Sequence, residues 1–145
     1  MSKSFQQIAR FVPLMVLVVA VLAACGGGAA SGGSPVQVQV TLTDFKIDSS
    51  LTTFSTGVPY HFVVVNKGAV AHEFVIMPPA QGLTGSESQL PATALAGIMG
   101  KDLAAGATKT LDYTFTQAAP AGGLEFACHL PGHYEAGMNT PIVVK

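Results

Sequence analysis

Leu124 to Met138 reads LEFACHLPGHYEAGM, and its two halves follow different patterns. In the first half the residues alternate as in a half-buried β-strand, which places Cys128 on the same inward face as the apolar residues two and four positions before it. In the second half His133 and Met138 follow at intervals of five residues. A strand that points its last side chain into a core is therefore predicted to continue into a loop that carries an imidazole and a thioether.

A second strand-like stretch reads AHEFVIM and begins at Ala71. The same period of two puts His72 on the inward face of this stretch and Glu73 on its outward face. His129, which follows Cys128 in the other stretch, is likewise expected to point outward. One thiolate, two imidazoles and a weakly bound thioether are the ligands of mononuclear copper sites that transfer electrons. We therefore predict one copper ion, cycling between Cu(I) and Cu(II), with the ligands His72, Cys128, His133 and Met138.

Residues 1–24 are predicted to be a lipoprotein signal peptide, because two basic residues precede fourteen apolar residues that end at Ala24. Such a stretch is short for a membrane span and typical of a secretory signal. The LAAC sequence that ends at Cys25 resembles the lipobox of bacterial lipoproteins. We expect Cys25 to be the lipidated first residue, followed in residues 25–35 by a flexible Gly/Ser-rich linker. The alternative is an ordinary signal peptide with a chance cysteine.

Net charge and cysteine content bear on the partners of the protein and on the state of its thiol. After removal of the signal the chain carries five lysines and eight acids, a net charge of −3 with neutral histidines. That balance predicts no nucleic-acid partner. With Cys25 lipidated, Cys128 is the remaining thiol in an exported, oxidising setting, so it has no cysteine of the same chain to pair with. Metal coordination would both use and protect this thiol.

Residues 36–145 are predicted to form one domain, since 110 residues are enough for a single core. Period-two alternation or short apolar runs predict six strands, and Asn66-Lys67-Gly68, Thr56-Gly57 and Pro120 to Gly123 are expected turns. The predicted strands are 36–42, 60–66, 71–77, 110–116, 123–128 and 141–144. Short strands with little helix favour an all-β fold, an antiparallel sandwich or barrel.

Residues 78–107 break the alternation and are rich in Gly, Ala and Ser. We expect a long excursion with one or two short helical turns. Met99 lies within this segment, and we interpret it as a packing residue rather than a ligand.

The two ligand motifs and the sequence VTLTDFK from Val40 to Lys46 resemble the cupredoxins, the family of plastocyanin, azurin, auracyanin and rusticyanin. The resemblance covers about residues 36–145, and the Cys-x4-His-x4-Met spacing is closest to rusticyanin. It implies an eight-stranded Greek-key β-sandwich with one type 1 (blue) copper. Glu73 occupies the place where azurin-like members often carry an Asn that ties the two ligand loops together, so the sequence departs from the family's pattern at the position of this tie.

Three further polar residues have alternative interpretations. His129, directly after the thiol, is either an outward-facing residue or one that tunes the copper. His61 is interpreted as a sheet-surface histidine and Glu135 as a solvated loop acid. An inward-turned Glu135 or Glu73 would instead give a copper site that is not blue.

The leading functional hypothesis is a membrane-tethered electron carrier of the cell envelope, facing the periplasm or the exterior, and not an enzyme. Its partners would be a redox protein that donates an electron and one that accepts it, such as a cytochrome or a membrane oxidoreductase complex, and the carrier itself is expected to be a monomer. The alternatives are a copper-binding or copper-delivery lipoprotein, and a structural or adhesive sandwich protein without metal.

Overall fold

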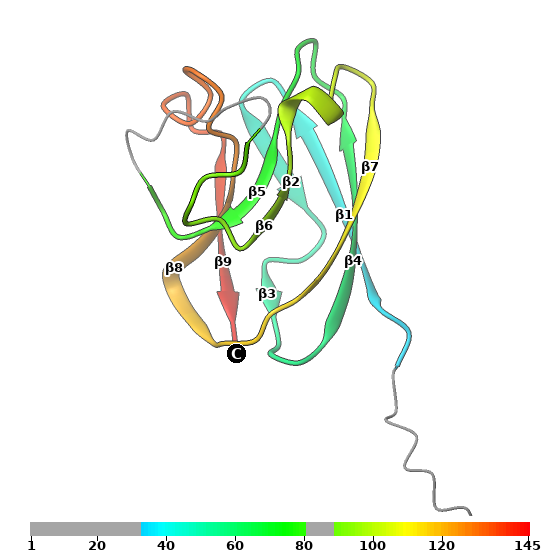
Figure 1. Cartoon of the computed structure of the whole chain (residues 1–145), viewed down its shortest axis with the longest axis vertical. Helices are drawn as coiled ribbons and strands as arrows, with labels where there is room; N and C mark the ends of the chain where they lie inside the picture. Colours follow the sequence, from blue (N-terminus) through cyan, green and yellow to red (C-terminus); the bar gives the residue numbers. More distant parts are fainter. Residues whose placement is uncertain (1–32, 81–88) are drawn as a thin grey trace, which may run out of the picture. The chain divides into compact units, whose positions relative to one another are not determined.

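The protein is described by a computed structural model that covers residues 33–80 and 89–145. Within these ranges the chain from Gly33 onward is one compact unit of two packed sheets (Figure 1). Its elements are β1 (Val36–Thr43), β2 (Lys46–Ser49), β3 (Thr53–Phe54), β4 (Pro59–Asn66), β5 (Phe74–Met77), β6 (Ala96–Ile98), the 3-10 turn η1 (Gly100–Asp102), β7 (Thr108–Thr114), β8 (Ala119–Ala127) and β9 (Asn139–Val144).

The predicted signal peptide and Cys25 lie outside the described residues, as does the linker apart from residues 33–35. In the part of the chain that is described, no helix has the length and apolarity needed to cross a bilayer.

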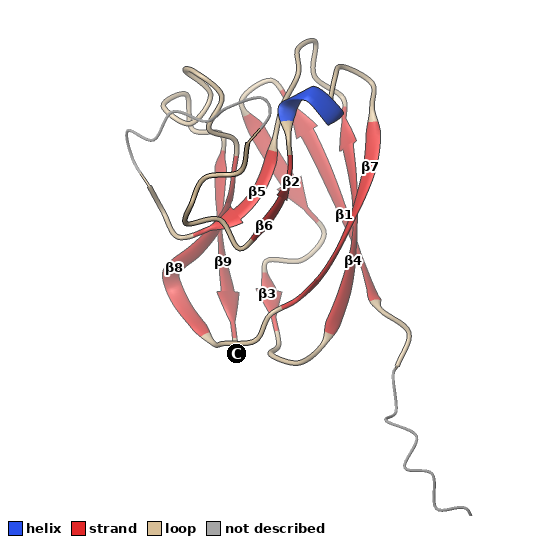
Figure 2. Ribbon diagram, viewed as in Figure 1, coloured by secondary structure: helices blue, strands red, loops and turns tan. Residues whose placement is uncertain are grey.

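The two sheets have the strand orders β2-β1-β4-β7 and β3-β9-β8-β5-β6 (Figure 2). Most neighbours are antiparallel, as predicted, but β1 pairs in parallel with β4, and β3 with β9. The all-antiparallel expectation is wrong at these two pairs. Alternation along a strand specifies which face is buried and carries no information about the direction of the neighbouring strand. The all-β sandwich itself is confirmed.

The core forms where the alternating strands of the two sheets face each other. In β1 the buried residues are Val38, Val40 and Leu42, spaced two apart as the sequence predicts. Five fully buried phenylalanines fill the interior between the sheets, with ring centroids of neighbouring pairs 4.9 to 5.9 Å apart. They are Phe54, Phe62, Phe74, Phe115 and Phe126. Burying each ring contributes on the order of 2–3 kcal/mol, so this cluster is a rigid base for whatever lies at the strand ends.

Strand β5, which lies between β8 and β6, is buried on both faces. Phe74 and Ile76 belong to the main core, whereas Val75 and Met77 pack with Met99 in a second apolar cluster. The segment after residue 77 covers the second face of β5 with Met99 and pairs β6 with its edge. The described part of this segment contains one short helical turn, η1. The interpretation of Met99 as a packing residue agrees with its position. Strand β6 was not predicted, because three residues are too few to show a period.

Several strand boundaries differ from the prediction, two of them by three residues or more. The strand expected from Ala71 begins only at Phe74, so His72 lies in the loop that precedes β5. The turn expected at Pro120 to Gly123 lies inside β8, where the pairing with β9 changes register between Ala119 and Leu124. Gly122 has a φ of 80°, a conformation that glycine adopts without strain, and the local signals for a turn and for a β-bulge are alike.

Candidate metal centre

Three of the four predicted ligands converge at one end of the sandwich. One donor atom each from His72, Cys128 and His133 lie within 4.8 Å of one another. His133 Nδ1 is 3.2 Å from His72 Nδ1 and 3.3 Å from Cys128 Sγ. Donors bound to one small metal ion at trigonal or tetrahedral angles lie roughly 3.3–3.8 Å apart. Two of the three separations are at or near these values, and the third, between His72 and Cys128, is within 4.8 Å.

The fourth predicted ligand, Met138, is held beside the other three by its main chain. Cys128 N–H donates to the Met138 carbonyl at 3.1 Å, and Met138 N–H donates to the His133 carbonyl at 3.0 Å. Its side chain is fully buried in the main core cluster that also contains Cys128. The position suits an axial ligand, and the assignment of all four ligands stays a prediction.

The loop between Cys128 and Met138 is a series of tight turns. His133 N–H donates to the Leu130 carbonyl at 2.9 Å, and Ala136 N–H donates to the Gly132 carbonyl at 3.1 Å. Gly132 has a φ of 82° and Gly137 one of 92°, which a residue with a Cβ adopts only with strain. The sequence therefore forms a short, internally bonded loop that fixes where His133 stands.

The protonation states of the donors follow from their surroundings. Burial raises the pKa of the Cys128 thiol to about 11, although the Glu73 N–H donates to its sulfur at 3.4 Å. Burial and the neighbouring His72 lower the pKa of His133, so its ring is neutral at pH 7. A metal that binds here meets a neutral His133 imidazole and must displace the proton of the thiol.

Glu73 and His129 tie the two ligand-bearing segments together. Glu73 Oε1 accepts a 2.7 Å hydrogen bond from His129 N–H, and both residues are buried. Glu73 therefore makes a tie at the place where azurin-like members often carry an Asn. The expectation that both side chains face outward is wrong, because both residues are buried. The His129 ring stacks on Tyr134 with centroids 4.3 Å apart.

Two residues of the β1–β2 turn lie beside the histidines and were not predicted from the sequence. Asp44 Oδ1 lies 3.2 Å from His72 Nε2. The next residue, Phe45, is about half exposed, and its ring meets that of His133 edge to face, with centroids 5.2 Å apart. Both lie in the segment that carries the cupredoxin resemblance, but nothing local marks them as neighbours of the histidines, because the contact depends on how the sheets pack.

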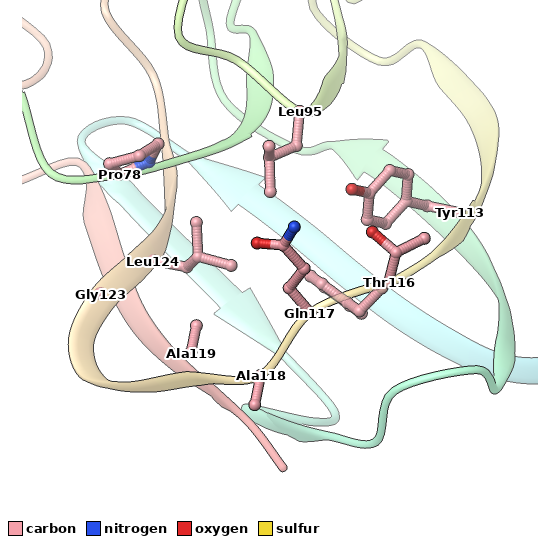
Figure 3. Close-up of a pocket in the computed structure, with 10 residues that line it drawn as sticks. Pro78, Leu95, Tyr113, Thr116, Gln117, Ala118, Ala119, Gly123 and Leu124 are labelled. Carbon is pink, nitrogen blue, oxygen red and sulfur yellow. The ribbon is translucent and has the colours of Figure 1, made fainter.

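The remaining candidates lie elsewhere. His61 is partly exposed on β4 and pairs with Asp112 of β7 at 2.6 Å, and Glu135 is exposed on the loop. Both positions agree with the simpler interpretations. A hollow of about 330 Å³ opens beside β7 and β8, and side chains that include Leu95, Tyr113 and Leu124 surround it (Figure 3). None of the four predicted ligands lines this hollow.

Solved structures identify the fold. Auracyanin from Roseiflexus castenholzii superposes with a TM-score of 0.57 at 17% identity, over 78% of this chain and 99% of that one. Auracyanin B gives a TM-score of 0.59 at 22% identity over 78% and 91%. Rusticyanin from Thiobacillus ferrooxidans gives 0.57 at 18% over 78% and 79%. The chain is a cupredoxin by fold.

One sequence relative carries a functional name. The chain is 34% identical over 111 residues to the protein of Rubrivivax gelatinosus named copper-resistant cuproprotein CopI. The match covers 74% of the chain and 66% of CopI, so the chain spans about two thirds of that relative. No protein-family model matches the chain. The described residues form nine strands, against the eight that the resemblance implied.

Proposed function

We propose that this cupredoxin binds one copper ion through His72, Cys128, His133 and Met138 and carries single electrons between redox proteins outside the cytoplasm. The observation that supports it best is the convergence of two imidazole nitrogens and one thiol within 4.8 Å at a buried strand end. Copper would supply the one-electron change between Cu(I) and Cu(II), which this soft, mixed nitrogen and sulfur set accommodates.

Preorganisation favours a carrier over a catalyst. The donors already lie close to ligand spacing, two of the three are fully buried, and the loop is internally hydrogen-bonded. A site held in this way rearranges little when the charge of its metal changes, and small rearrangement makes electron transfer fast. Four protein donors also leave no open position for a substrate, whereas catalytic metal sites keep one.

His133 is the donor best placed to pass electrons. It is the partly exposed member of the cluster, and its ring touches the exposed Phe45. Four exposed loop residues around it are small or apolar, namely Pro131, Gly132, Ala136 and Gly137, and Glu135 is the charged residue among them. A small apolar surface suits brief docking of an electron donor and an acceptor, such as a cytochrome or a membrane oxidoreductase complex.

Membrane tethering is the second part of the proposal. The apolar leader of residues 1–24 and the LAAC sequence support export and lipidation of Cys25, and residues 25–35 would then be the linker. Attached acyl chains contribute about 0.8 kcal/mol for each buried methylene, so more than one chain on the same cysteine holds a protein stably at a membrane.

A copper-binding role in copper resistance is the second candidate function. It is favoured by the 34% identity to a relative named for copper resistance. The same donors would hold copper for storage or handover, and electron transfer would not be needed. Full burial of Cys128 and His72 argues for the carrier, because handover is easier from exposed donors.

Visible and electron paramagnetic resonance spectra of the purified, Cu(II)-loaded protein test the proposal. We expect an intense blue or green Cu(II)-thiolate band with narrow copper hyperfine splitting, lost in Cys128→Ser and kept in His61→Gln, a histidine outside the cluster. Weak, ordinary Cu(II) spectra in all three proteins would reject the electron carrier and place copper handling first.

A further inference from the structure

Asp44 is the charged side chain that contacts the cluster from outside. Its Oδ1 lies 3.2 Å from Nε2 of the fully buried His72. The carboxylate is itself held in place, because Ala69 N–H donates to Oδ1 at 3.1 Å and to Oδ2 at 3.2 Å. Asp44 is thus a fixed acceptor at the end of β1 rather than a freely rotating surface acid.

This contact decides which nitrogen of His72 can bind a metal. A carboxylate only accepts hydrogen bonds, so the proton shared with Asp44 must sit on Nε2. In the neutral ring the lone pair is then on Nδ1, the atom that faces His133 Nδ1 at 3.2 Å. The Asp44 carboxylate therefore presents His72 to the cluster in the tautomer that a metal requires.

Gly68 shows that this arrangement is closely fitted. A Cβ on Gly68 would lie 2.5 Å from Asp44 Oδ1 and 2.6 Å from His72 Nε2, closer than real contacts allow. Gly68 is held there because its N–H donates to the Asn66 side chain at 2.8 Å. The Asn66 amide in turn donates to the carbonyls of Val70 and Leu103, each at 2.8 Å. Any side chain at residue 68 would push Asp44 and His72 apart.

The same turn also reaches the second histidine. Phe45 has a φ of 67°, which is uncommon for an aromatic residue, and its ring meets the His133 ring edge to face. A strained backbone persists only when surrounding contacts stabilise it. The turn therefore places Asp44 against His72 and Phe45 against His133 at once.

We infer that Asp44 is a positioning residue of the metal centre: it fixes His72 as an Nδ1 donor and, through its negative charge, favours Cu(II) over Cu(I). A carboxylate behind a ligating histidine orients the ring and makes it a stronger donor, and such partners change metal affinity by about 10–100-fold. Stronger donation stabilises the more positive ion, so Asp44 lowers the reduction potential. The apolar core beneath Cys128 acts in the opposite direction. The part concerning potential rests on the proposed copper function.

Asp44→Asn tests the charge, because asparagine has the same size and still offers an oxygen to His72. Asp112→Asn is the matched control, since Asp112 forms another Asp–His pair, with His61 at 2.6 Å. We expect Asp44→Asn to keep the Cu(II)-thiolate band but to lose about tenfold in Cu(II) affinity relative to Cu(I), which raises the potential by about 59 mV. Asp112→Asn should leave both unchanged. A blue wild type whose potential is the same in Asp44→Asn would overturn the inference.

The tautomer is tested without copper, which separates the inference from the proposed function. Nitrogen-15 spectra of the histidines in the metal-free protein should show His72 protonated at Nε2 in the wild type. Gly68→Ala and Asp44→Ala should give a mixture of tautomers, with thermal melting as the check on folding. A single Nε2–H tautomer in both folded variants would overturn the inference. A fixed tautomer in a wild type that gives no blue band would instead reject the carrier and leave the role of Asp44 intact.

Discussion

Glu73 contacts the segment of Cys128 in two directions at once: its Oε1 accepts a 2.7 Å hydrogen bond from His129 N–H, and its own N–H donates to Cys128 Sγ at 3.4 Å. The residue that follows one predicted ligand therefore holds the main chain that follows another. Burial raises the pKa of the Glu73 carboxyl, opposed by the hydrogen bond from His129. The two ligand-bearing segments are joined before any metal binds.

Glu73→Ala should destabilise the metal-free protein by about 1–3 kcal/mol, because it leaves the buried N–H of His129 without its acceptor. Glu73→Gln keeps an oxygen at the same place and should retain most of that stability. Urea unfolding measures both, with the exposed Glu135→Gln as a control that should change little. Equal stability of Glu73→Ala and wild type would show that the tie contributes nothing.

The metal-free protein should lose stability at alkaline pH through Cys128. Its pKa is raised from 9.0 to about 11 on folding, so the folded state holds the thiol proton more tightly than the unfolded state does. The contribution is complete below pH 9 and is lost as the pH rises through about 11, and two pKa units correspond to roughly 2–3 kcal/mol.

Unfolding free energies of wild type and Cys128→Ser between pH 7 and 11 isolate this effect. Tyr134, whose pKa burial raises to about 12, titrates in both proteins and cancels in the comparison. The wild type should lose the extra stability across this range, and parallel pH profiles would contradict the assignment.

Met138→Leu should keep the Cu(II)-thiolate band and raise the reduction potential, because the thioether donates weakly to Cu(II) and leucine does not donate at all. Met99→Leu is the matched control: Met99 is also buried but packs in the second apolar cluster with Val75 and Met77. Voltammetry compares the three proteins. A lowered potential in Met138→Leu, or an equal rise in Met99→Leu, would remove the axial role of Met138.

Local sequence signals predicted what depends on single strands and single loops. Alternation placed Val38, Val40 and Leu42 in the core, and spacing brought Cys128, His133 and Met138 together, because these relations lie within one strand or one turn-rich loop. The direction in which Cys128 points followed from the same period of two.

Contacts and pairings between segments that are distant in the sequence could not be predicted from local patterns. The pairing of β1 with β4, the burial of Glu73 and His129 and the contact of Asp44 with His72 all depend on which surfaces the fold brings together. Glu73 and His129 were expected to face outward because alternation along a strand separates two faces but does not show what covers the second one. The sequence around Asp44 is that of an ordinary turn, and its contacts with Ala69 and His72 come from a loop that is distant in the sequence.

The direction of β1 places the entry of the chain and the metal centre at opposite ends of one strand. Residues 33–35 enter the sandwich at Val36, and Asp44 follows the last residue of that strand. Eight extended residues span about 26 Å. If Cys25 is the anchor, the end that bears His133 and Phe45 lies about 26 Å along β1 from the point where the anchored segment joins the sandwich, where it is open to soluble proteins and to the projecting parts of membrane complexes.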